Sequence, residues 1–393
     1  MKVEIVKFDY FGRGIGKIND KIVFVNRALP NEIVNVSLIK EKKHFSEVII
    51  NNLVKKSDDR IEAICPFYHQ CGGCDFLHTT YNVEKKFKIA KAKELLGRCD
   101  NFYETKEMNY RNKVTLHVKN GKIGYYKEKT NDLVKIDYCY LLDNNINKVI
   151  NDLNKINLQD YDIKIIVIKA NQGKILVNID GAVDEKFVNC IYYVDNIISK
   201  NKIIKGNGYL EETIKNKRFK ITSEAFFQVN KEGLENIYQV ISKNIQDKKI
   251  NNALDLYSGT GLWGILISEY VKSVTCIEIN TEACLNAKDN LLNNNIKNVK
   301  IINGDVSKYI DSFCNIDLVI TDPPRSGLNI KTVNYLKKFK AKYFIYISCD
   351  MQTLKRDLDL LKDVYEIQTI ELVDMFKRTY HCETVVILER KAR

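Results

Sequence analysis

Cys349 and Glu383 are a thiol and a carboxyl group that could support covalent catalysis, and each lies at the end of a strand-like run. Cys349 follows the apolar run YFIYI (343–347) at the mouth of an expected helix, whose dipole favours a thiolate. Glu383 opens the apolar run ETVVILE, where its carboxylate could act as a base. Taken singly, each has an ordinary explanation, because cysteine is often a small buried apolar residue and a glutamate at a strand end is often solvated.

A glycine-rich segment, DLYSGTGLWG, follows another apolar run and opens a helix. Gly259, Gly261 and Gly264 complete the pattern G-x-G-x-x-G, which lets the backbone approach a ligand at a helix N-terminus. Glu278 ends the next apolar run, where a carboxylate can accept both hydroxyls of a ribose. On these features alone, an NAD-binding domain is a serious alternative.

Two further acids follow the next two strand-like runs. Asp305 is expected near an adenine amino group, and Asp322 opens the sequence DPPR at 322–325. A dehydrogenase has no need of such a loop, whereas methyltransferases use an Asp-Pro-Pro loop to hold a planar base near the methyl donor. The combination favours S-adenosylmethionine as the cofactor. Because these loops usually serve methylation of an exocyclic nitrogen, an amino-methyltransferase is one alternative.

Cys349 and Glu383 fit a different target, the 5-carbon of a pyrimidine. That carbon is too weakly nucleophilic to take a methyl group unaided, so a thiolate must first add at the 6-position. A base must then remove the proton at the 5-position. Both groups come at strand ends in the same predicted sheet as Asp322, and this joint placement predicts a nucleophile and a base.

Three of the eleven cysteines, Cys65, Cys71 and Cys74, lie within ten residues of one another. In a chain expected to be cytoplasmic, such crowding indicates a metal site rather than disulfides. Zinc and a [4Fe–4S] cluster both accept four thiolates, and the spacing alone slightly favours zinc. The cysteines expected to be core or incidental residues are Cys99, Cys190, Cys276, Cys284, Cys314 and Cys382.

The elements that position the catalytic candidates follow a regular rhythm after residue 220. Strand-like runs alternate with helical stretches such as 281–292, and they lie at 253–257, 274–279, 299–303, 317–321, 343–347, 365–372 and 383–389. This alternation predicts an α/β domain over 221–393 with a mostly parallel seven-stranded sheet flanked by helices. Ligands bind at the carboxyl ends of the strands in such sheets, which is where the candidates fall.

Two segments precede this domain. Residues 1–56 alternate apolar and polar residues in short runs separated by turn residues, which predicts a small β-barrel. Such barrels often bind oligonucleotides, although a structural lid is an alternative. Residues 57–220 hold the cysteine cluster, a basic helix at 83–96 and several strand-like runs, and they predict an α+β central domain.

The composition is that of a globular protein with an excess of basic residues. The chain has 62 Lys plus Arg against 50 Asp plus Glu, a net charge of +12. This excess suits a polyanionic partner, although a Lys- and Asn-rich composition accounts for part of it. No apolar run reaches the roughly 18 residues of a membrane span, and the start has no secretory pattern. We therefore expect a cytoplasmic protein with no membrane or obligate protein partner.

Family motifs occur along the chain in a characteristic order: YRNK (110–113), FFQVN (226–230), DLYSGTG, DPPRSG, SCD and DMF…T…H…E. Over essentially its whole length the chain resembles the bacterial RNA uracil-5-methyltransferases. The form it resembles has an N-terminal TRAM domain and an iron–sulfur cluster, and it methylates 23S ribosomal RNA. The resemblance implies a class I, Rossmann-like methyltransferase fold with a TRAM barrel, S-adenosylmethionine as donor and 23S rRNA as substrate.

The resemblance also implies roles at matching positions. Donor binding is assigned to Gln228, Tyr257, Glu278 and Asp305, with Asp322 where the donor and the base meet. Gly259 is a further donor-site candidate, from the glycine pattern. Cys349 is assigned as the nucleophile and Glu383 as the base. The cluster is expected to be [4Fe–4S], with zinc as the alternative, on Cys65, Cys71, Cys74 and Cys139.

Four positions depart from the family pattern. The usual Ser-Cys-Asn-Pro reads SCDM at 348–351, Lys377 replaces a proline, and Leu262 stands where asparagine is common. Asp350 is expected to oppose thiolate formation unless its side chain points away from Cys349.

Several segments are candidates for contact with RNA: KEKKHF (40–45), EKKFKIAKAK (84–93), Phe226, Phe227, Arg111 and Lys113. A uracil in a folded RNA must leave its stack to reach a thiol. The remaining alternatives are a uracil methyltransferase that acts on tRNA and a non-catalytic RNA-binding protein.

Overall fold

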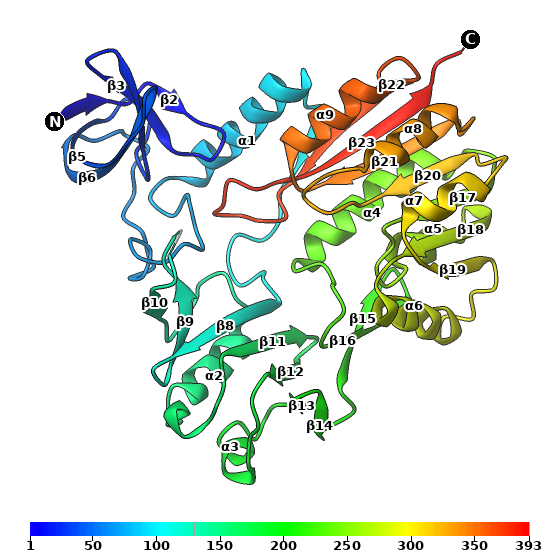
Figure 1. Cartoon of the computed structure of the whole chain (residues 1–393), viewed down its shortest axis with the longest axis horizontal. Helices are drawn as coiled ribbons and strands as arrows, with labels where there is room; N and C mark the ends of the chain where they lie inside the picture. Colours follow the sequence, from blue (N-terminus) through cyan, green and yellow to red (C-terminus); the bar gives the residue numbers. More distant parts are fainter. Residues whose placement is uncertain (129, 393) are drawn as a thin grey trace. The chain divides into compact units, whose positions relative to one another are not determined.

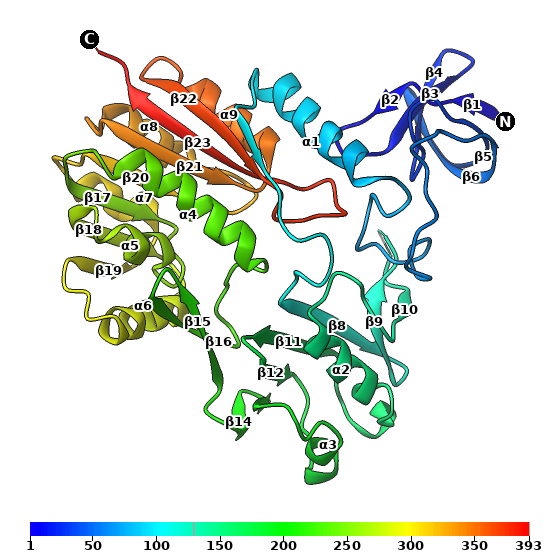
Figure 2. The same cartoon turned by 180° about the vertical axis from the view of Figure 1, so that it is seen from behind.

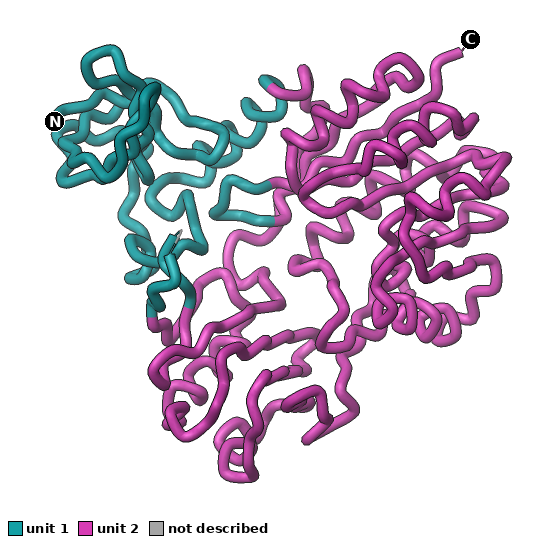
Figure 3. The backbone as a smooth tube through the Cα atoms, in the orientation of Figure 1, with its two compact units in different colours: residues 1–94, 125–134, 376–381 teal, residues 95–124, 135–375, 382–393 magenta. Residues whose placement is uncertain are grey.

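Two compact units make up the protein, whose computed structural model describes residues 1–128 and 130–392. Unit 1 takes in residues 1–94, 125–134 and 376–381, and unit 2 takes in residues 95–124, 135–375 and 382–393 (Figure 3). Segments from three parts of the sequence therefore meet in unit 1. The three-domain division expected from the sequence stays a prediction.

The chain begins with a small, mostly antiparallel β-sheet structure (Figure 1). Its strands are β1 (Lys2–Glu4), β2 (Lys7–Phe8), β3 (Gly14–Ile18), β4 (Lys21–Val25), β5 (Ile33–Glu41) and β6 (Phe45–Lys55). They pair in the order β1-β5-β6-β4-β3-β2, and only β4 and β6 pair in parallel among these described strands. Alternate side chains such as Val3, Val23 and Val36 point into one core because side chains alternate between the faces of a strand.

Helix α1 (Tyr81–Leu96) follows the cysteine-rich segment, and a mixed sheet comes next. The sheet has the order β10-β9-β8-β11-β12-β13-β14. Its strands are β8 (Lys113–Lys119), β9 (Lys122–Tyr126), β10 (Leu133–Lys135), β11 (Ile165–Asn171), β12 (Lys174–Ile179), β13 (Asn196–Ser199) and β14 (Lys202–Lys205). The helices in this region are α2 (Asn144–Leu153), η1 (Leu158–Asp160) and α3 (Glu185–Cys190). A hairpin of β15 (Tyr209–Ile214) and β16 (Lys217–Thr222) leads onward.

The last part of the chain forms the predicted α/β sheet, in the order β19-β18-β17-β20-β21-β23-β22-β7. Its strands are β17 (Ile250–Leu256), β18 (Val271–Glu278), β19 (Val299–Asn303), β20 (Leu318–Thr321), β21 (Tyr343–Ser348), β22 (Tyr365–Val373) and β23 (Glu383–Arg390), with β7 (Asn101–Tyr103) at one edge. Strands β17 to β21 are parallel, and β23 runs antiparallel between β21 and β22. The predicted mostly parallel sheet is confirmed, and β7 is an addition that the sequence did not reveal.

Helices cover both faces of this sheet (Figures 1 and 2). One face carries α4 (Lys231–Ile245), α5 (Leu262–Ile267) and α6 (Thr281–Asn293), and the other carries α7 (Val306–Tyr309), η2 (Ile310–Ser312), α8 (Ile330–Lys338) and α9 (Met351–Leu361). On the second face, Leu336 and Leu354 from the helices pack with Val319 and Phe344 from the strands in one buried core. Within the described residues, no helix is long and apolar enough to cross a membrane.

Candidate active site

The catalytic candidates gather at one edge of the α/β sheet. Tyr257 follows β17, Glu278 ends β18, Asp305 comes after β19, Asp322 follows β20 and Cys349 follows β21. Parallel strands bring their carboxyl ends to the same edge, so these residues share it. Glu383 reaches this edge from the opposite direction because it is the first residue of antiparallel β23.

Cys349 and Glu383 are neighbours across a strand pair. Ser348 of β21 pairs with Thr384 of β23, so each candidate comes one residue beyond a paired position. Glu383 is buried, and its Oε2 has no hydrogen-bond partner among the described residues. Burial raises the pKa of this carboxyl well above its usual value, and the charge of Asp322 raises it further, while Arg325 opposes the shift.

The thiol of Cys349 lies in the same electrostatic environment. Burial raises its pKa to about 12, with Glu383 next in importance and Arg325 acting in the opposite direction. Cys349 does precede helix α9, as expected. Burial and the neighbouring acids nevertheless raise the pKa of this thiol in the structure.

Asp350 acts as the N-cap of α9. Its Oδ1 accepts hydrogen bonds from the Gln352 amide (2.9 Å) and the Thr353 amide (3.0 Å). The side chain is therefore turned toward the helix, as an asparagine at this position could also be. Its charge still raises the pKa of Cys349, but it is the weakest of the named contributions.

Asp322 links the nucleophile region to the expected donor site. Its Oδ2 accepts from Trp263 Nε1 (3.2 Å) and from Gln228 Nε2 (3.5 Å). Burial raises the pKa of Asp322 to about 6, and the Trp263 hydrogen bond lowers it. Trp263 and Arg325 were not assigned from the sequence. Both lie inside quoted motifs, and Trp263 is the single tryptophan of the chain, which was the available signal.

The glycine-rich loop leaves room for a ligand at one position. Gly259 has a φ of 54°, and a side chain there would meet nothing within 4 Å. Its amide donates to Glu278 Oε2 (2.9 Å), and the Asn280 amide donates to Glu278 Oε1 (2.7 Å). Gly264 has a different role, because a Cβ there would lie 2.3 Å from Cys276 Sγ on the adjacent strand. The loop thus fits a group that needs open backbone beside a carboxylate.

Tyr257 and Asp305 follow neighbouring parts of the same sheet edge. Tyr257 is half-buried and has a φ of 61°, a conformation that is uncommon outside glycine. Asp305 caps α7 by accepting from the Ser307 amide (2.8 Å), and this bond lowers the pKa of the carboxyl.

The YRNK motif supports the loop that carries Gln228. Asn112 Nδ2 donates to the Gln228 carbonyl (3.3 Å), and the Asn112 amide donates to the Val229 carbonyl (3.0 Å). Lys169 Nζ donates to the carbonyls of Thr222 (2.7 Å) and Ala225 (2.8 Å) at the start of this loop. Asn112, which was not singled out from the sequence, therefore positions this loop through hydrogen bonds.

The expected RNA contacts differ in accessibility. Phe226 is 65% exposed, whereas Phe227 is 7% exposed and packs beside Phe219 with ring centroids 5.9 Å apart. Phe227 is thus a core residue, which is the ordinary alternative to its being a candidate for stacking on RNA. The lysines of KEKKHF (40–45) are exposed.

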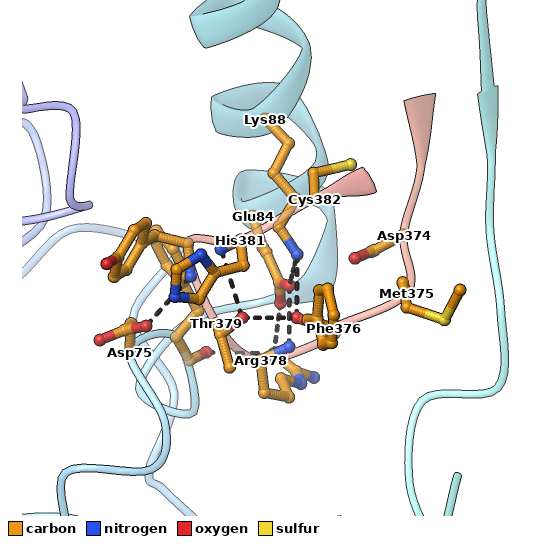
Figure 4. A network of polar contacts seen from close by, with 12 residues as sticks. Asp75, Glu84, Lys88, Asp374, Met375, Phe376, Arg378, Thr379, His381 and Cys382 are labelled. Atoms are coloured by element: carbon orange, nitrogen blue, oxygen red, sulfur yellow. Dashed lines mark hydrogen bonds and ion pairs between the residues drawn. The ribbon is translucent and has the colours of Figure 1, made fainter. Parts of the chain in front are cut away.

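The basic helix 84–93 is also less available than expected. Lys88 and Lys91 are buried, and Lys88 Nζ pairs with Glu84 Oε1 (2.6 Å). Figure 4 shows this pair beside the loop of residues 376–381, where the Arg378 amide donates to Glu84 Oε1 (2.8 Å). Lys91 Nζ donates to the Tyr380 carbonyl (2.7 Å). These two lysines serve the fold of unit 1 because buried charges require partners.

Lys377, which replaces the proline usual in the family, is buried in unit 1. Its Nζ lies 3.7 Å from the centre of the Tyr81 ring, a cation–π contact.

The cysteines expected to hold a cluster are divided between the units. Cys65, Cys71 and Cys74 belong to unit 1, and Cys139 belongs to unit 2. Across residues 1–128 and 130–392, no three or more His, Cys, Asp or Glu side chains are arranged to hold a metal ion. The cluster therefore stays a prediction from the resemblance, and no chemical role is derived for it.

Two parts of the chain match known protein families. Residues 194–391 match the model of the family described as tRNA (Uracil-5-)-methyltransferase, and residues 1–47 match that of the TRAM domain. An uncharacterized RNA methyltransferase of Clostridium acetobutylicum is 31% identical, over 99% of this chain and 96% of that protein. Another, from Aquifex aeolicus, is 30% identical, over 100% of this chain and 99% of that protein.

The chain belongs to the tRNA (uracil-5-)-methyltransferase family. This uracil-5-methyltransferase family member is an S-adenosylmethionine-dependent RNA methyltransferase with a TRAM domain at its start. Its fold is similar to that of the Pyrococcus abyssi tRNA (uracil-54, C5)-methyltransferase, solved with S-adenosyl-L-homocysteine. The TM-score is 0.83 at 24% identity, over 99% of this chain and 100% of that one. The class I methyltransferase fold is confirmed.

Proposed function

We propose that this enzyme methylates carbon 5 of a uracil in RNA through a covalent bond between Cys349 and carbon 6. The observation that carries the proposal is the meeting of Cys349, Glu383 and Asp322 at one sheet edge, where each acid raises the pKa of the thiol. An enzyme that methylates an exocyclic nitrogen needs no thiol and no second base at this position.

The donor site is proposed at the carboxyl ends of β17 to β19. Gly259 offers open backbone, and Gln228, Tyr257, Glu278 and Asp305 border it. When bound, S-adenosylmethionine supplies an electrophilic methyl group on a sulfonium. A carboxylate has two oxygens with several lone pairs, so Glu278 can accept ribose hydroxyls while it holds the loop.

The chain's own residues then act in sequence. Cys349, as the thiolate, forms a bond to carbon 6 of the uracil, and the ring electrons move to carbon 5. Carbon 5 takes the methyl group. Glu383 then removes the proton from carbon 5, the double bond re-forms, and the Cys349 sulfur leaves as a thiolate. Asp322 accepts hydrogen bonds from Trp263 and Gln228 at its Oδ2, and it orients the uracil between the nucleophile and the methyl donor.

A matched set of variants tests this mechanism. Cys349→Ala should lower the rate of methyl transfer by roughly 10³-fold or more, because the uncatalysed carbon is too weak a nucleophile. Cys382→Ala, which removes a nearby buried thiol that donates to the Val373 carbonyl, should keep most of the activity. Glu383→Gln should accumulate a denaturation-resistant RNA–protein adduct carrying the methyl group. Full methylation by Cys349→Ala would favour an amino-methyltransferase instead.

We further propose 23S rRNA as the substrate, because the motif order and the cysteine spacing resemble the family form that acts on it. The description of the matching family and the name of the Pyrococcus abyssi protein refer to tRNA, which makes tRNA the alternative. Mass-spectrometric mapping of 5-methyluridine in total RNA, with and without the gene, distinguishes them. Loss of the mark from tRNA alone would overturn the rRNA assignment.

The cluster on Cys65, Cys71, Cys74 and Cys139 stays a prediction from the resemblance. Iron, sulfide and zinc analysis of protein purified without oxygen tests it. Stoichiometric iron and sulfide that are lost in Cys74→Ala would support the cluster, and zinc in their place would support the alternative metal.

A further inference from the structure

Lys169 is a buried lysine on strand β11 whose charge the proposed methyl transfer does not use. The residue is 5% exposed, and its Nζ donates hydrogen bonds to the carbonyls of Thr222 (2.7 Å) and Ala225 (2.8 Å). Burying an ammonium group is unfavourable, and these two partners carry no formal charge to offset it. The presence of this charge is therefore hard to explain by packing alone.

The two carbonyls belong to residues 222–230, a segment that connects β16 to α4 and carries Gln228. In the described chain this segment forms no helix or strand after its first residue, so its backbone groups need other hydrogen-bond partners. Lys169 supplies them near the start of the segment. Asn112 supplies them at the other end, to the carbonyls of Gln228 (3.3 Å) and Val229 (3.0 Å).

The same segment bonds to two parts of the proposed donor site. Gln228 Nε2 donates to Asp322 Oδ2 (3.5 Å) at the carboxyl end of β20. The Thr222 hydroxyl accepts from Asn286 Nδ2 (2.9 Å) on α6, the helix that follows Glu278 in the chain. All of these residues lie in unit 2. A shift of the segment would therefore disturb the groups that border the methyl donor.

The space beside Lys169 is too small to hold a substrate group. The cavity there measures about 20 Å³ and is lined by Lys113 and Phe227, among others. Such a volume suits a single water molecule and no part of a nucleotide. Lys169 therefore acts through the segment that it holds, without touching the donor or the RNA.

The charge of Lys169 is sensitive to pH near neutrality. Burial, followed by the charge of Lys113 on β8, lowers the pKa of its ammonium group to about 7, while Glu224 opposes the shift. The neighbours on β15 and β16 that line the small cavity, Leu210 and Ile221, are apolar. Loss of the proton leaves an amine with two N–H donors, whose bonds to carbonyls are roughly half as strong.

We infer that Lys169 is a positioning residue for the methyl transfer, because its ammonium group holds residues 222–230 so that Gln228 meets the donor. The inference rests on the proposed donor site but not on covalent catalysis. Its consequence is that the donor and its demethylated product bind more tightly while Lys169 is charged. With the donor at a saturating concentration, the rate of the chemical step does not depend on this difference.

Calorimetric binding of S-adenosylhomocysteine to the full-length protein at about pH 6 and pH 8.5 tests the inference. Each variant is compared with wild type at the same pH, so the titration of Asp322 affects both proteins alike. Lys169→Met should weaken binding roughly tenfold at the lower pH, where Lys169 is charged, and less than about twofold at the higher pH. Lys169→Arg, which stays charged, should bind as wild type does at the lower pH and more tightly than wild type at the higher pH.

Two further lysines make the test specific. Lys113→Met should move the wild-type loss of affinity to higher pH, because it removes the neighbouring cation, and this result can be measured even if Lys169→Met does not fold. Lys174→Met is the matched control, because Lys174 is exposed on the adjacent strand β12 and donates to Asp195 (2.9 Å). It should leave the affinity unchanged. Equal weakening by Lys169→Met at both pH values, an unmoved profile in Lys113→Met, or weakening by Lys174→Met would each overturn the inference.

Gln228→Ala separates this inference from the proposed function. Weaker binding in Gln228→Ala, with unchanged binding in Lys169→Met, would overturn the inference and leave the proposed donor site in place. Unchanged binding in both variants would overturn the inference together with that site. Cys349→Ala should keep the wild-type pH dependence of binding even if the covalent mechanism fails, since no thiol takes part in holding the segment.

Discussion

Cys349 is surrounded by acids, an environment that keeps a thiol protonated. Burial, Glu383, Asp322 and Asp350 all raise its pKa, and only Arg325 among the named contributors lowers it. A protonated thiol is a poor nucleophile but also resists oxidation. We therefore expect the reactive thiolate to be a minor species whose fraction depends on pH and on Arg325.

Methyl transfer should accelerate as pH rises. With the pKa of Cys349 raised to about 12, the thiolate fraction grows about tenfold per pH unit between about pH 6 and pH 9. The value of kcat/KM, measured under single-turnover conditions, should follow this slope without levelling off. Arg325→Met should lower kcat/KM at every pH, because Arg325 is the cation that lowers the pKa of Cys349. A plateau below about pH 8 would contradict the prediction.

Asp322 should destabilise the folded protein at neutral pH. Its folded-state pKa is raised to about 6, so between the usual value near 3.8 and about 6 the folded state holds a proton that the unfolded state has lost. Stability from this group therefore falls as pH rises through that window. Asp322→Asn should be more stable than wild type at about pH 8, by on the order of 1–3 kcal/mol.

Thermal unfolding at about pH 4.5 and pH 8 measures this difference. The advantage of Asp322→Asn should shrink at the lower pH, where the wild-type carboxyl is protonated. Asp359→Asn, which alters an exposed pair with Lys355 on α9, serves as the control. An advantage that is the same at both pH values would contradict the assignment.

Among the secondary-structure elements, α1 and the loop of residues 376–381 depend on each other. The helix was predicted at 83–96 and is found at Tyr81–Leu96, but its burial was not predictable from its sequence. The partners of Glu84, Lys88 and Lys91 lie almost 300 residues later in the chain. A run of lysines suggests a solvated surface unless those distant partners are known.

Removal of one member of this network should therefore be costly. Lys88 donates to Glu84 Oε1 (2.6 Å) and to the Phe376 carbonyl (3.3 Å), and both charged side chains are fully buried. Lys88→Met should lower the free energy of unfolding by roughly 3–5 kcal/mol, because it leaves a buried carboxylate undercompensated. Urea unfolding measures the change.

Two comparisons make this test specific. Lys355→Met breaks an exposed pair of the same helical spacing on α9, and it should cost about 0.5 kcal/mol or less. The double variant Glu84→Gln/Lys88→Met should recover part of the loss. The side-chain carbonyl of the new glutamine carries no charge and can still accept the hydrogen bond from the Arg378 backbone amide. Equal losses for Lys88→Met and Lys355→Met would show that the network is not stabilising.

For the whole molecule, the strands of the α/β sheet could be predicted from the sequence better than its edge strand and the direction of β23. Strands such as β19, found at the expected residues 299–303, are apolar runs whose pattern is local. Edge strand β7 has only three residues (Asn101–Tyr103) and depends on pairing with β22, so no local periodicity reveals it. The sequence predicted that Cys349 and Glu383 lie at strand ends in one sheet, but their adjacency depends on the antiparallel insertion of β23 between β21 and β22, and local periodicity does not give the direction of a strand.

The net charge of +12 should act through particular exposed lysines. Lys40, Lys42 and Lys43 lie on the barrel and are exposed. Lys88 and Lys91 are buried inside unit 1 and bond to other groups of the protein. Each lysine that neutralises a phosphate of a single strand contributes roughly 0.7 to the slope of log affinity against log salt concentration. Replacing the three barrel lysines by alanine should lower the slope for an oligouridine by up to about 2.

A control variant with the same loss of charge separates local contact from overall attraction. Three exposed lysines outside the barrel serve for it: Lys186, Lys249 and Lys362. Their replacement should change the slope little, because counterions are released only where phosphates are contacted. Equal reductions for both triple variants would mean that the barrel lysines act only through net charge. A reduction confined to the barrel variant would identify Lys40, Lys42 and Lys43 as phosphate contacts that supply affinity without sequence preference.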